Sequence, residues 1–187
     1  MRQKNRVGVF LGEMGQPVSL LKYSKSACGV DFLLNTADNS EKPGWFNLSK
    51  QYKTDFFEFY FFRRAEGYML LAGKRVELHP DMVLVISPFQ LQEWHVDLDK
   101  LDYTFLIFQE EFINNFLSDK YFMYRLLFCY QHDYPSDFDM NSDEMSPFLR
   151  LLLQLKNELL ELVVDSYHMI IACRYLSLLY FYRFHSY

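Results

Sequence analysis

The chain has 187 residues, a length that fits one domain or one domain with a small helical extension. Half of its residues are hydrophobic and 19% are aromatic, and this composition excludes an intrinsically disordered protein. The 24 acidic and 19 basic residues give a net charge of -5, which argues against a chain that grips nucleic-acid phosphates by itself.

Cysteine usage and hydropathy indicate where the protein resides. The three cysteines are far apart and in none of the spacings of disulfide frameworks or metal knuckles: Cys28, Cys129 and Cys173. The apolar run 7–11 is too short for the core of a signal peptide. The most apolar stretch, 169–182, contains Arg174 and falls short of the roughly 18–20 apolar residues that span a bilayer. We therefore expect a cytoplasmic protein without a membrane segment.

The first 40 residues carry little readable pattern. Val18–Leu21 and Val30–Leu34 are apolar enough for short strands, and a polar cluster follows at Asn35–Lys42. No function is assigned to this part of the chain.

From about Trp45 to Gln109, short runs rich in Phe, Tyr and Val are separated by turn signals, which is typical of β structure. The expected strands are Asp55–Phe62, Tyr68–Leu71, Val76–Leu78, Met82–Ile86, Leu91–Val96 and Tyr103–Phe108. The expected turns between them are Arg63–Gly67, a tight hairpin at Ala72–Lys74, and His79–Asp81. At least six strands at intervals of about 8–12 residues favour a sandwich or a barrel.

After Gln109 the pattern becomes helical. Helices are expected at 110–117 and 121–130, followed by a polar loop at 131–139. Asn141 and Glu144 have the spacing of a capping box, whereas Ser146 followed by Pro147 offers a later start for the same helix.

The two last helices contain apolar faces that need partners. Phe148, Leu152, Leu155, Leu159 and Leu162 fall at spacings of three and four and form one stripe, and the final helix, Tyr167 to about Arg183, is apolar almost all round. One interpretation is that both helices pack on the β core. The other is a dimer interface or a docking face for another domain, with the interface at Leu152, Leu155, Leu159 and Leu162.

Common catalytic signatures do not occur in the sequence. It contains no Gly-rich phosphate loop, no Gly-x-Ser-x-Gly elbow and no His-Glu-x-x-His pair. Of the five histidines, His95 beside Trp94 on an expected strand is the one candidate for a pocket; a structural role is the alternative.

Three segments together resemble a known family. They are Thr54–Phe62, Gly73–Pro88 and Phe105–Phe112. In order and spacing they resemble the cupin motifs of the amino-terminal sensor domain of AraC/XylS-family transcription regulators, over roughly residues 50–183. The resemblance implies an α+β fold, with a cupin-like β-barrel (jelly roll) in residues 1–109 and carboxy-terminal helices for dimerisation or docking in residues 110–187 of the same domain.

The residues at the family's metal-ligand positions do not suit a metal. These positions hold Tyr52, Thr54, Glu58 and Gln92, so one carboxylate remains and no imidazole. One carboxylate does not replace the three or four nitrogen and oxygen ligands of a catalytic transition metal. We expect no metal, no cofactor and no catalytic residue.

Strand alternation places the expected binding site inside the β part. If Thr54 and Glu58 point inward, Phe56 and Tyr60 do so too, and Trp94 shares a face with Gln92. The expected ligand-binding residues are Thr54, Phe56, Glu58, Tyr60, Gln92, Trp94 and His95. The alternative is a filled aromatic core in which Glu58 is bound by Arg63, Arg64 or a backbone donor.

The resemblance implies an effector-sensing and dimerisation domain of a transcription regulator. Its partners would be a small molecule, such as a sugar or another polar metabolite, and a second copy of the chain. DNA would be bound only through a carboxy-terminal helix-turn-helix domain that these residues do not contain. The alternatives are a free-standing, metal-free cupin enzyme of the isomerase or epimerase type, using Glu58 with Tyr60 or His95 as acid and base, and a dimerisation module without a ligand.

Overall fold

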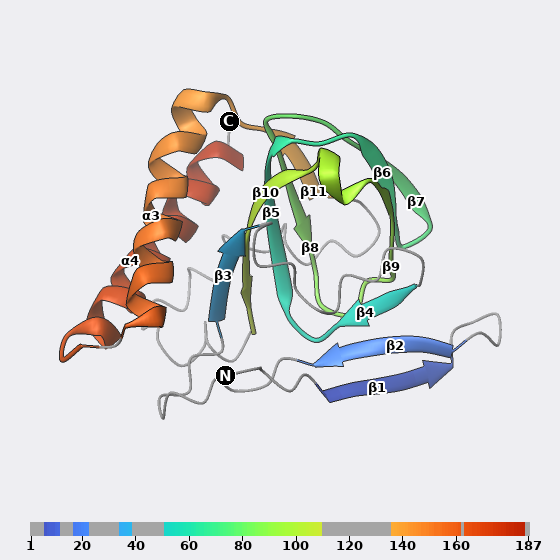
Figure 1. Ribbon diagram of the computed structural model, residues 1–187, viewed down its shortest axis with the longest axis horizontal. Helices are drawn as coiled ribbons and strands as arrows, with labels where there is room; N and C mark the ends of the chain where they lie inside the picture. The colour runs from blue at the N-terminus through green and yellow to red at the C-terminus, as the bar shows by residue number, and fades with distance from the viewer. Residues whose placement is uncertain are drawn as a thin grey trace.

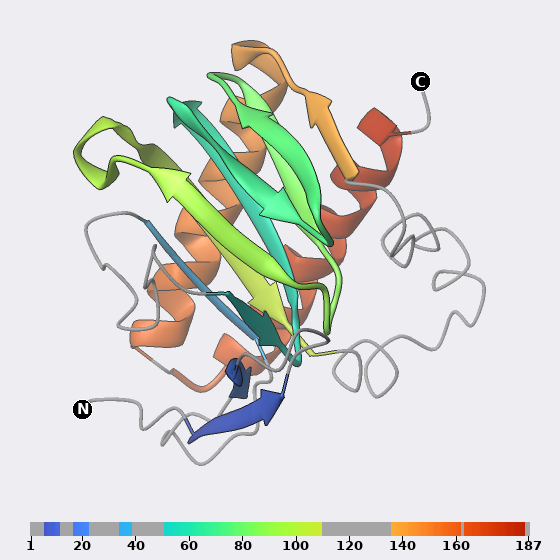
Figure 2. The same cartoon turned by 90° about the vertical axis from the view of Figure 1, so that its right-hand side faces the viewer.

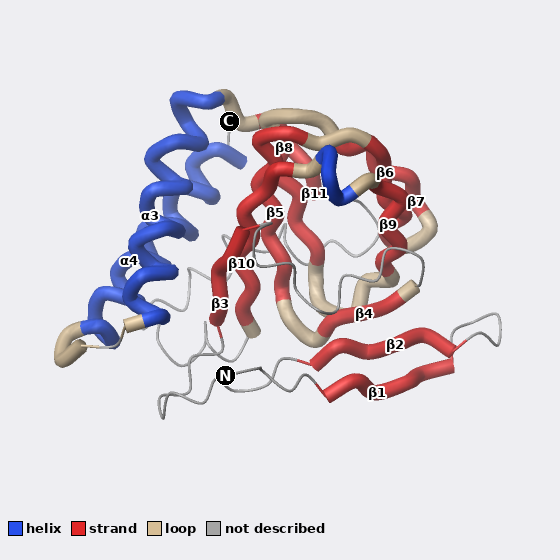
Figure 3. The backbone as a smooth tube through the Cα atoms, in the orientation of Figure 1, coloured by secondary structure: helices blue, strands red, loops and turns tan. Residues whose placement is uncertain are grey.

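The protein combines two β-sheets with two carboxy-terminal helices in a computed structural model (Figure 1). The structure describes residues 6–11, 17–22, 34–38, 51–109, 136–161 and 163–185. Figure 3 shows that the strands and the two long carboxy-terminal helices occupy separate parts of the molecule. This is the α+β class that the sequence predicts.

The strands form one sheet of six and one of five. The six-stranded sheet contains, in order, β1 (Arg6–Leu11), β2 (Pro17–Lys22), β4 (Tyr52–Thr54), β9 (Gln92–Val96), β6 (Gly67–Leu71) and β7 (Lys74–Leu78). The five-stranded sheet contains β11 (Ser136–Asp139), β8 (Met82–Ile86), β5 (Phe57–Arg64), β10 (Asp102–Phe108) and β3 (Leu34–Asp38). All neighbouring strands are antiparallel except β2 and β4, which run parallel.

The five-stranded sheet is the central layer. The six-stranded sheet covers one of its faces, and α3 (Ser142–Leu160) and α4 (Ser166–His185) cover the other (Figures 1 and 2). A strand buried on both faces needs apolar side chains in both directions. This explains why β8 is apolar throughout and why aromatic residues follow one another along β5.

The two layers of packing create two hydrophobic cores. Tyr60, Phe62 and Trp94 belong to the core between the two sheets. Phe59 and Phe148 belong to the core between the five-stranded sheet and the helices. Among the described residues no hydrogen-bonded ladder joins the two sheets, so the structure shows two facing sheets, and a closed barrel stays a prediction.

The hairpin between β6 and β7 forms where the sequence predicts it. Its two turn residues, Ala72 and Gly73, have φ angles of 50° and 79°. Two successive residues with positive φ give the turn whose twist matches that of antiparallel strands. A short 3-10 helix, η2 (Leu98–Lys100), connects β9 to β10.

The capping box decides where α3 begins. The Asn141 side chain accepts hydrogen bonds from the backbone N–H groups of Asp143 and Glu144, and the Glu144 carboxylate accepts one from the N–H of Asn141. The helix therefore starts at Ser142, and Pro147 lies inside it.

Three segments differ from the sequence prediction. Arg63 and Arg64 extend β5 instead of forming a turn, because the strand continues to pair with β10 as far as Arg64 and Asp102. The polar cluster after residue 34 contains most of β3, and the polar loop before residue 140 contains β11. The helices expected at 110–117 and 121–130 lie outside the described residues, and the boundary expected between residues 109 and 110 stays a prediction.

Candidate functional site

Six of the seven predicted ligand-binding residues meet between the two sheets. Thr54 lies on β4, Glu58 and Tyr60 on β5, and Gln92 and Trp94 on β9, while Phe56 precedes β5. All six side chains are buried. The alternation of side chains along the strands places them together, as the sequence predicts.

Glu58 is the centre of a buried hydrogen-bond network. The hydroxyl of Thr54 donates to its Oε1 at 2.8 Å, and the hydroxyl of Tyr60 donates to its Oε2 at 2.7 Å. The Nε2 group of Gln92 also donates to Oε1. In the part of the chain that the structure describes, none of these partners is a cation.

The arginines proposed as partners of Glu58 bind elsewhere. Arg63 forms a salt bridge with Asp102, and Arg64 donates to the backbone oxygen of Asp99. The proposed pairing with Glu58 is therefore wrong. The physical reasons differ for the two arginines. Arg63 lies on the opposite face of β5 from Glu58, and Arg64, on the same face, lies at the exposed end of the strand.

Burial governs the ionisation of this network. It raises the pKa of Glu58, and the hydrogen bonds from Gln92, Tyr60 and Thr54 oppose that rise. Burial and the neighbouring Glu58 carboxylate also raise the pKa of Tyr60 well above its ordinary value, so the phenol stays neutral. The Gln92 Oε1 atom is buried and has no hydrogen-bond partner among the described residues.

Aromatic rings fill the space around the network. The Nε1 group of Trp94 donates to the hydroxyl oxygen of Tyr52 at 2.8 Å, and the edge of one ring meets the face of the other between Tyr60 and Trp94, at a centroid distance of 5.1 Å. The rings of Tyr60 and Tyr103 are 5.9 Å apart. This is the filled-core arrangement, and the entry of a ligand among these residues stays a prediction.

His95 lies apart from the other six residues. Because side chains alternate along β9, Gln92 and Trp94 face the interior while His95 faces outward. Its ring stacks on Tyr68 at 4.5 Å, and its Nε2 atom is 2.8 Å from Glu93. The placement of His95 in an interior site is therefore wrong.

The leucine stripe of α3 belongs to the core. Leu152 and Leu155 are buried against the five-stranded sheet, and Leu159 packs against the same core while partly buried. Leu162 lies outside the described residues. The predicted dimer interface is therefore wrong for these buried leucines, because a side chain covered by its own sheet cannot contact a second copy.

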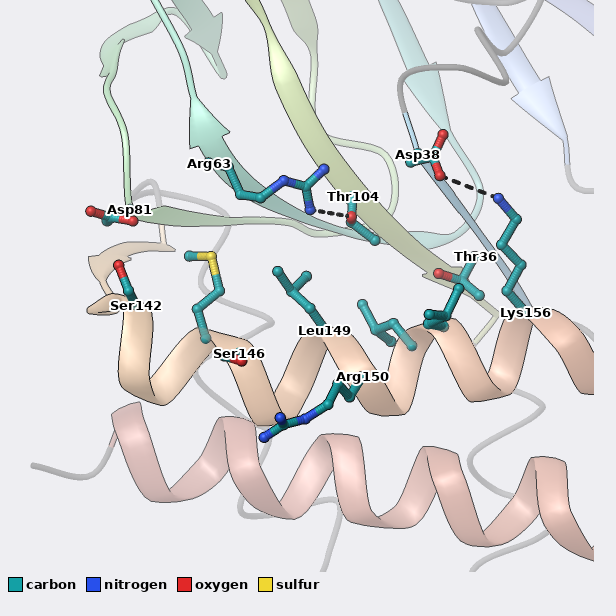
Figure 4. A pocket seen from close by; sticks show the side chains of 13 residues that line it. Thr36, Asp38, Arg63, Asp81, Thr104, Ser142, Ser146, Leu149, Arg150 and Lys156 are labelled. Carbon is teal, nitrogen blue, oxygen red and sulfur yellow. Dashed lines mark hydrogen bonds and ion pairs between the residues drawn. The ribbon is translucent and has the colours of Figure 1, made fainter.

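A cleft lies between α3 and the outer face of the five-stranded sheet (Figure 4). Its volume is about 640 Å³, within the usual range of small-molecule sites. It is lined by Thr36, Asp38, Arg63, Asp81, Thr104, Ser142, Met145, Ser146, Leu149, Arg150, Leu152, Leu153 and Lys156. Sequence reasoning missed this cleft because its walls come from β3, β5, β10 and α3, and no local pattern joins them.

Two ion pairs cross or border the cleft. Lys156 of α3 reaches Asp38 of β3 at 3.3 Å. Arg63 binds Asp102 and also donates to the hydroxyl of Thr104 at 2.9 Å. The basic groups of Arg63 and Lys156 therefore each have a partner already.

The described residues contain neither a metal-binding cluster nor a membrane-spanning helix. No group of three or more His, Cys, Asp or Glu side chains in these ranges is arranged to hold a metal ion. No helix within them is long and apolar enough to cross a membrane.

The chain was compared with protein families, curated proteins and solved structures. No protein-family model matches the chain, and no curated protein matches it. The fold is similar to that of apo ToxT K231A from Vibrio cholerae strain SCE256, with 12% sequence identity and a TM-score of 0.46. The match covers 84% of this chain and 55% of that chain, so this chain spans just over half the length of the protein it matches.

Proposed function

We propose that the chain is a ligand-sensing regulatory domain of an AraC-type transcription regulator, with a jelly-roll β part. The support comes from the order and spacing of the cupin-like segments, and from the two facing sheets and carboxy-terminal helix pair that this resemblance implies. The observation that carries the proposal is the cleft of about 640 Å³ between α3 and the sheet.

The position of the cleft suggests how a ligand acts. One wall is the β part and the other is α3, so a bound molecule contacts both at once. A ligand shifts a conformational equilibrium only by its difference in affinity for the two states. A molecule that fits the cleft only at one position of α3 against the sheet therefore favours that position. Because α3 packs against α4, a shift of α3 also changes the contacts of α4.

A non-catalytic role suits the interior of the protein. Glu58 is fully buried, and two of the three groups that bind it are hydroxyls that do not ionise at neutral pH. A general acid or base must lie within hydrogen-bonding reach of its substrate. The packed rings of Tyr60 and Trp94 leave Glu58 without such access, which weighs against the isomerase alternative.

Binding to DNA is assigned to a separate helix-turn-helix domain. The net charge of -5 favours this assignment, since a surface that grips phosphates needs an excess of basic residues. The regulator is assigned to the cytoplasm, in keeping with three cysteines that are too far apart in the sequence for a disulfide framework.

Homodimerisation is part of the proposal, through surfaces other than the buried leucine stripe. Leu160 on α3 is 70% exposed, and Val163 and Val164 after it are 69% and 97% exposed. Sedimentation analysis of the wild type and of Leu160→Lys tests this. A dimer that becomes a folded monomer supports the interface, and a wild-type monomer contradicts the dimer.

A ligand screen with matched variants tests the sensing role. A molecule present at a hundredfold excess over its Kd raises the free energy of unfolding by about 2.7 kcal/mol, which a thermal shift detects. Leu149→Trp fills the cleft and should abolish the shift, whereas Asn157→Trp, at an exposed position outside the cleft on the same helix, should not. If stabilising molecules act equally on both variants, the cleft is not the sensing site; if the protein converts such a molecule, the enzyme alternative is correct.

A further inference from the structure

Three basic side chains, Arg63, Arg150 and Lys156, and two acidic ones, Asp38 and Asp81, line the cleft, and Figure 4 shows Arg150 directed away from the sheet. Arg63 holds Asp102, and Lys156 holds Asp38, each within salt-bridge distance. An incoming anion must therefore displace a carboxylate that is already bound, and it exchanges one partner for another with little net gain. An incoming cation meets the guanidinium of Arg63, which Figure 4 shows over the middle of the cleft. The paired groups thus disfavour ions of either sign in the middle of the cleft, and the carboxylate of Asp81 lies at one end.

One end of the cleft offers hydrogen-bonding groups that are not in use. The carboxylate of Asp81 and the hydroxyls of Ser142 and Ser146 line this end, and within the described ranges none of the three side chains has a hydrogen-bond partner. The two serines are four residues apart and so lie on one face of α3. A carboxylate accepts hydrogen bonds and a hydroxyl both donates and accepts them, a combination that suits the hydroxyl groups of a neutral molecule.

Asp81 is held in place by its backbone. Its N–H donates to the oxygen of Phe62 at 2.8 Å, and its C=O accepts from the N–H of Met140 at 2.8 Å. Its φ angle of 61° is a conformation that Asp and Asn adopt more readily than most residues. The carboxylate is therefore presented from a fixed turn, which lowers the entropy lost when a ligand binds.

The middle of the cleft is apolar. Met145, Leu149 and Leu153 follow one another at intervals of four residues along the face of α3 that lines the cleft. With a rise of 1.5 Å per residue, the distance along α3 from Ser142 to Leu153 is about 16 Å. Leu153 is 58% exposed, so a ligand that covers it removes apolar surface from water.

We propose that the cleft binds an uncharged amphiphile. Its hydroxyl-bearing head lies at Asp81, Ser142 and Ser146, and its apolar body lies along Leu149 and Leu153. This inference rests on the proposed function in one respect, since it takes the cleft as the sensing site.

Three probes with eight carbons separate the chemical classes. They are 1,2-octanediol, which is neutral, octanoate, which is an anion, and octylammonium, which is a cation, all measured at pH 7 by calorimetric titration of the full chain. We expect the diol to bind at least tenfold more tightly than either ion. Ser142→Ala combined with Ser146→Ala should weaken the diol at least tenfold, while Asn157→Ala, an exposed change elsewhere on α3, should leave its affinity unchanged.

Leu153→Asn distinguishes failure of the inference from failure of the sensing site. The side chain is exposed, so this variant should keep its fold, which urea unfolding checks. It removes apolar surface without adding a charge, so it should weaken every probe that lies in the cleft. If an ion binds as tightly as the diol and Leu153→Asn weakens it, the chemical class is wrong and the site remains. If no probe binds, or if Leu153→Asn leaves the affinity of every probe unchanged, both the class and the sensing site are wrong.

Discussion

Replacement of Glu58 by alanine or by glutamine tests the buried network most directly. In Glu58→Ala, the hydroxyls of Thr54 and Tyr60 and the amide of Gln92 lose their common acceptor. Each buried donor left without a partner costs about 1–3 kcal/mol. Thr54 and Gln92 keep only longer hydrogen bonds, to the backbone oxygen of Phe56 at 3.3 Å and to the hydroxyl of Thr54 at 3.4 Å. The replacement should therefore lower the free energy of unfolding by roughly 2–3 kcal/mol.

Glu58→Gln keeps the shape and removes the charge. Its oxygen still accepts hydrogen bonds, the hydroxyls of Thr54 and Tyr60 can turn to accept from its amide, and its N–H can reach the Oε1 atom of Gln92, which has no partner among the described residues. We expect this variant to be at least as stable as the wild type at pH 8, in contrast to Glu58→Ala.

The pH dependence follows from the direction in which the pKa of Glu58 moves on folding. Burial raises this pKa, so the folded protein holds the proton more tightly than the unfolded chain does. The resulting stability is fully present below the unfolded value, near 4.5, and is lost as pH rises through the higher folded pKa. A tenfold difference in proton affinity between the folded and unfolded states corresponds to about 1.4 kcal/mol. The stability of the wild type relative to Glu58→Gln should therefore fall as pH rises.

Urea unfolding of the wild type and both variants between pH 4.5 and 8 measures these differences, with tryptophan fluorescence as the signal and linear extrapolation to water. Subtraction of the Glu58→Gln curve removes the titration of all other groups. The reasoning is refuted if the relative stability of the wild type rises with pH, or if Glu58→Gln loses as much stability at pH 8 as Glu58→Ala.

Three further predictions concern the core, the backbone and metals. Leu155→Ala should lower the free energy of unfolding by about 2–5 kcal/mol because the side chain is fully buried, whereas Leu160→Ala, at an exposed position, should change it by no more than ~0.5 kcal/mol. Equal losses in urea unfolding would contradict the orientation of α3. Gly67→Ala should destabilise the protein far more than Gly73→Ala. A Cβ at Gly67 would lie 2.5 Å from the backbone oxygen of His95, whereas a Cβ at Gly73 meets nothing within 4 Å and adds only about 1–2 kcal/mol of backbone strain. Melting temperatures in the opposite order would contradict the pairing of β6 with β9. Protein purified without chelator should contain no stoichiometric Fe, Mn, Ni or Zn, and a content near one per chain would contradict the metal-free assignment.

The strands between residues 55 and 108 could be predicted because their signals are local. Gly73 marks the β6–β7 hairpin, and Pro80 and Pro88 flank the buried run that becomes β8. The capping box at Asn141 is local too, and it fixes the start of α3 within one residue. In each case the residues that determine the conformation lie within a few positions of one another.

The strands β3 and β11 could not be predicted because their pairing is not local. Both are edge strands of the five-stranded sheet, where polar side chains are tolerated on the open side. Thr36 pairs with Leu106, and Asp137 pairs with Leu84, at separations of 70 and 53 residues. Their extended conformation depends on a neighbour that the local sequence does not reveal.

An apolar stripe reports burial but not the surface that buries it. Leu155 is equally consistent with a core and with a dimer interface until the position of the sheet is known. Similarly, strand alternation places Glu58 in the interior with Gln92 but does not identify its donors, since Arg64 shares the face of Glu58 and still binds elsewhere. The missing information is the geometry of two sheets face to face.

The cleft and the core share a residue, and this determines how a ligand is coupled to α3. The ion pair between Lys156 and Asp38 links the helix to β3, but its side chains are 20% and 36% exposed, and exposed pairs contribute about 1 kcal/mol or less. Leu152 lines the cleft and also belongs to the core against the five-stranded sheet. Packed cores respond to small changes in volume because their side chains are close-packed. A ligand that contacts Leu152 therefore changes the packing that holds α3 against the sheet. A ligand that only breaks the ion pair changes the free energy of the helix position by about 1 kcal/mol or less.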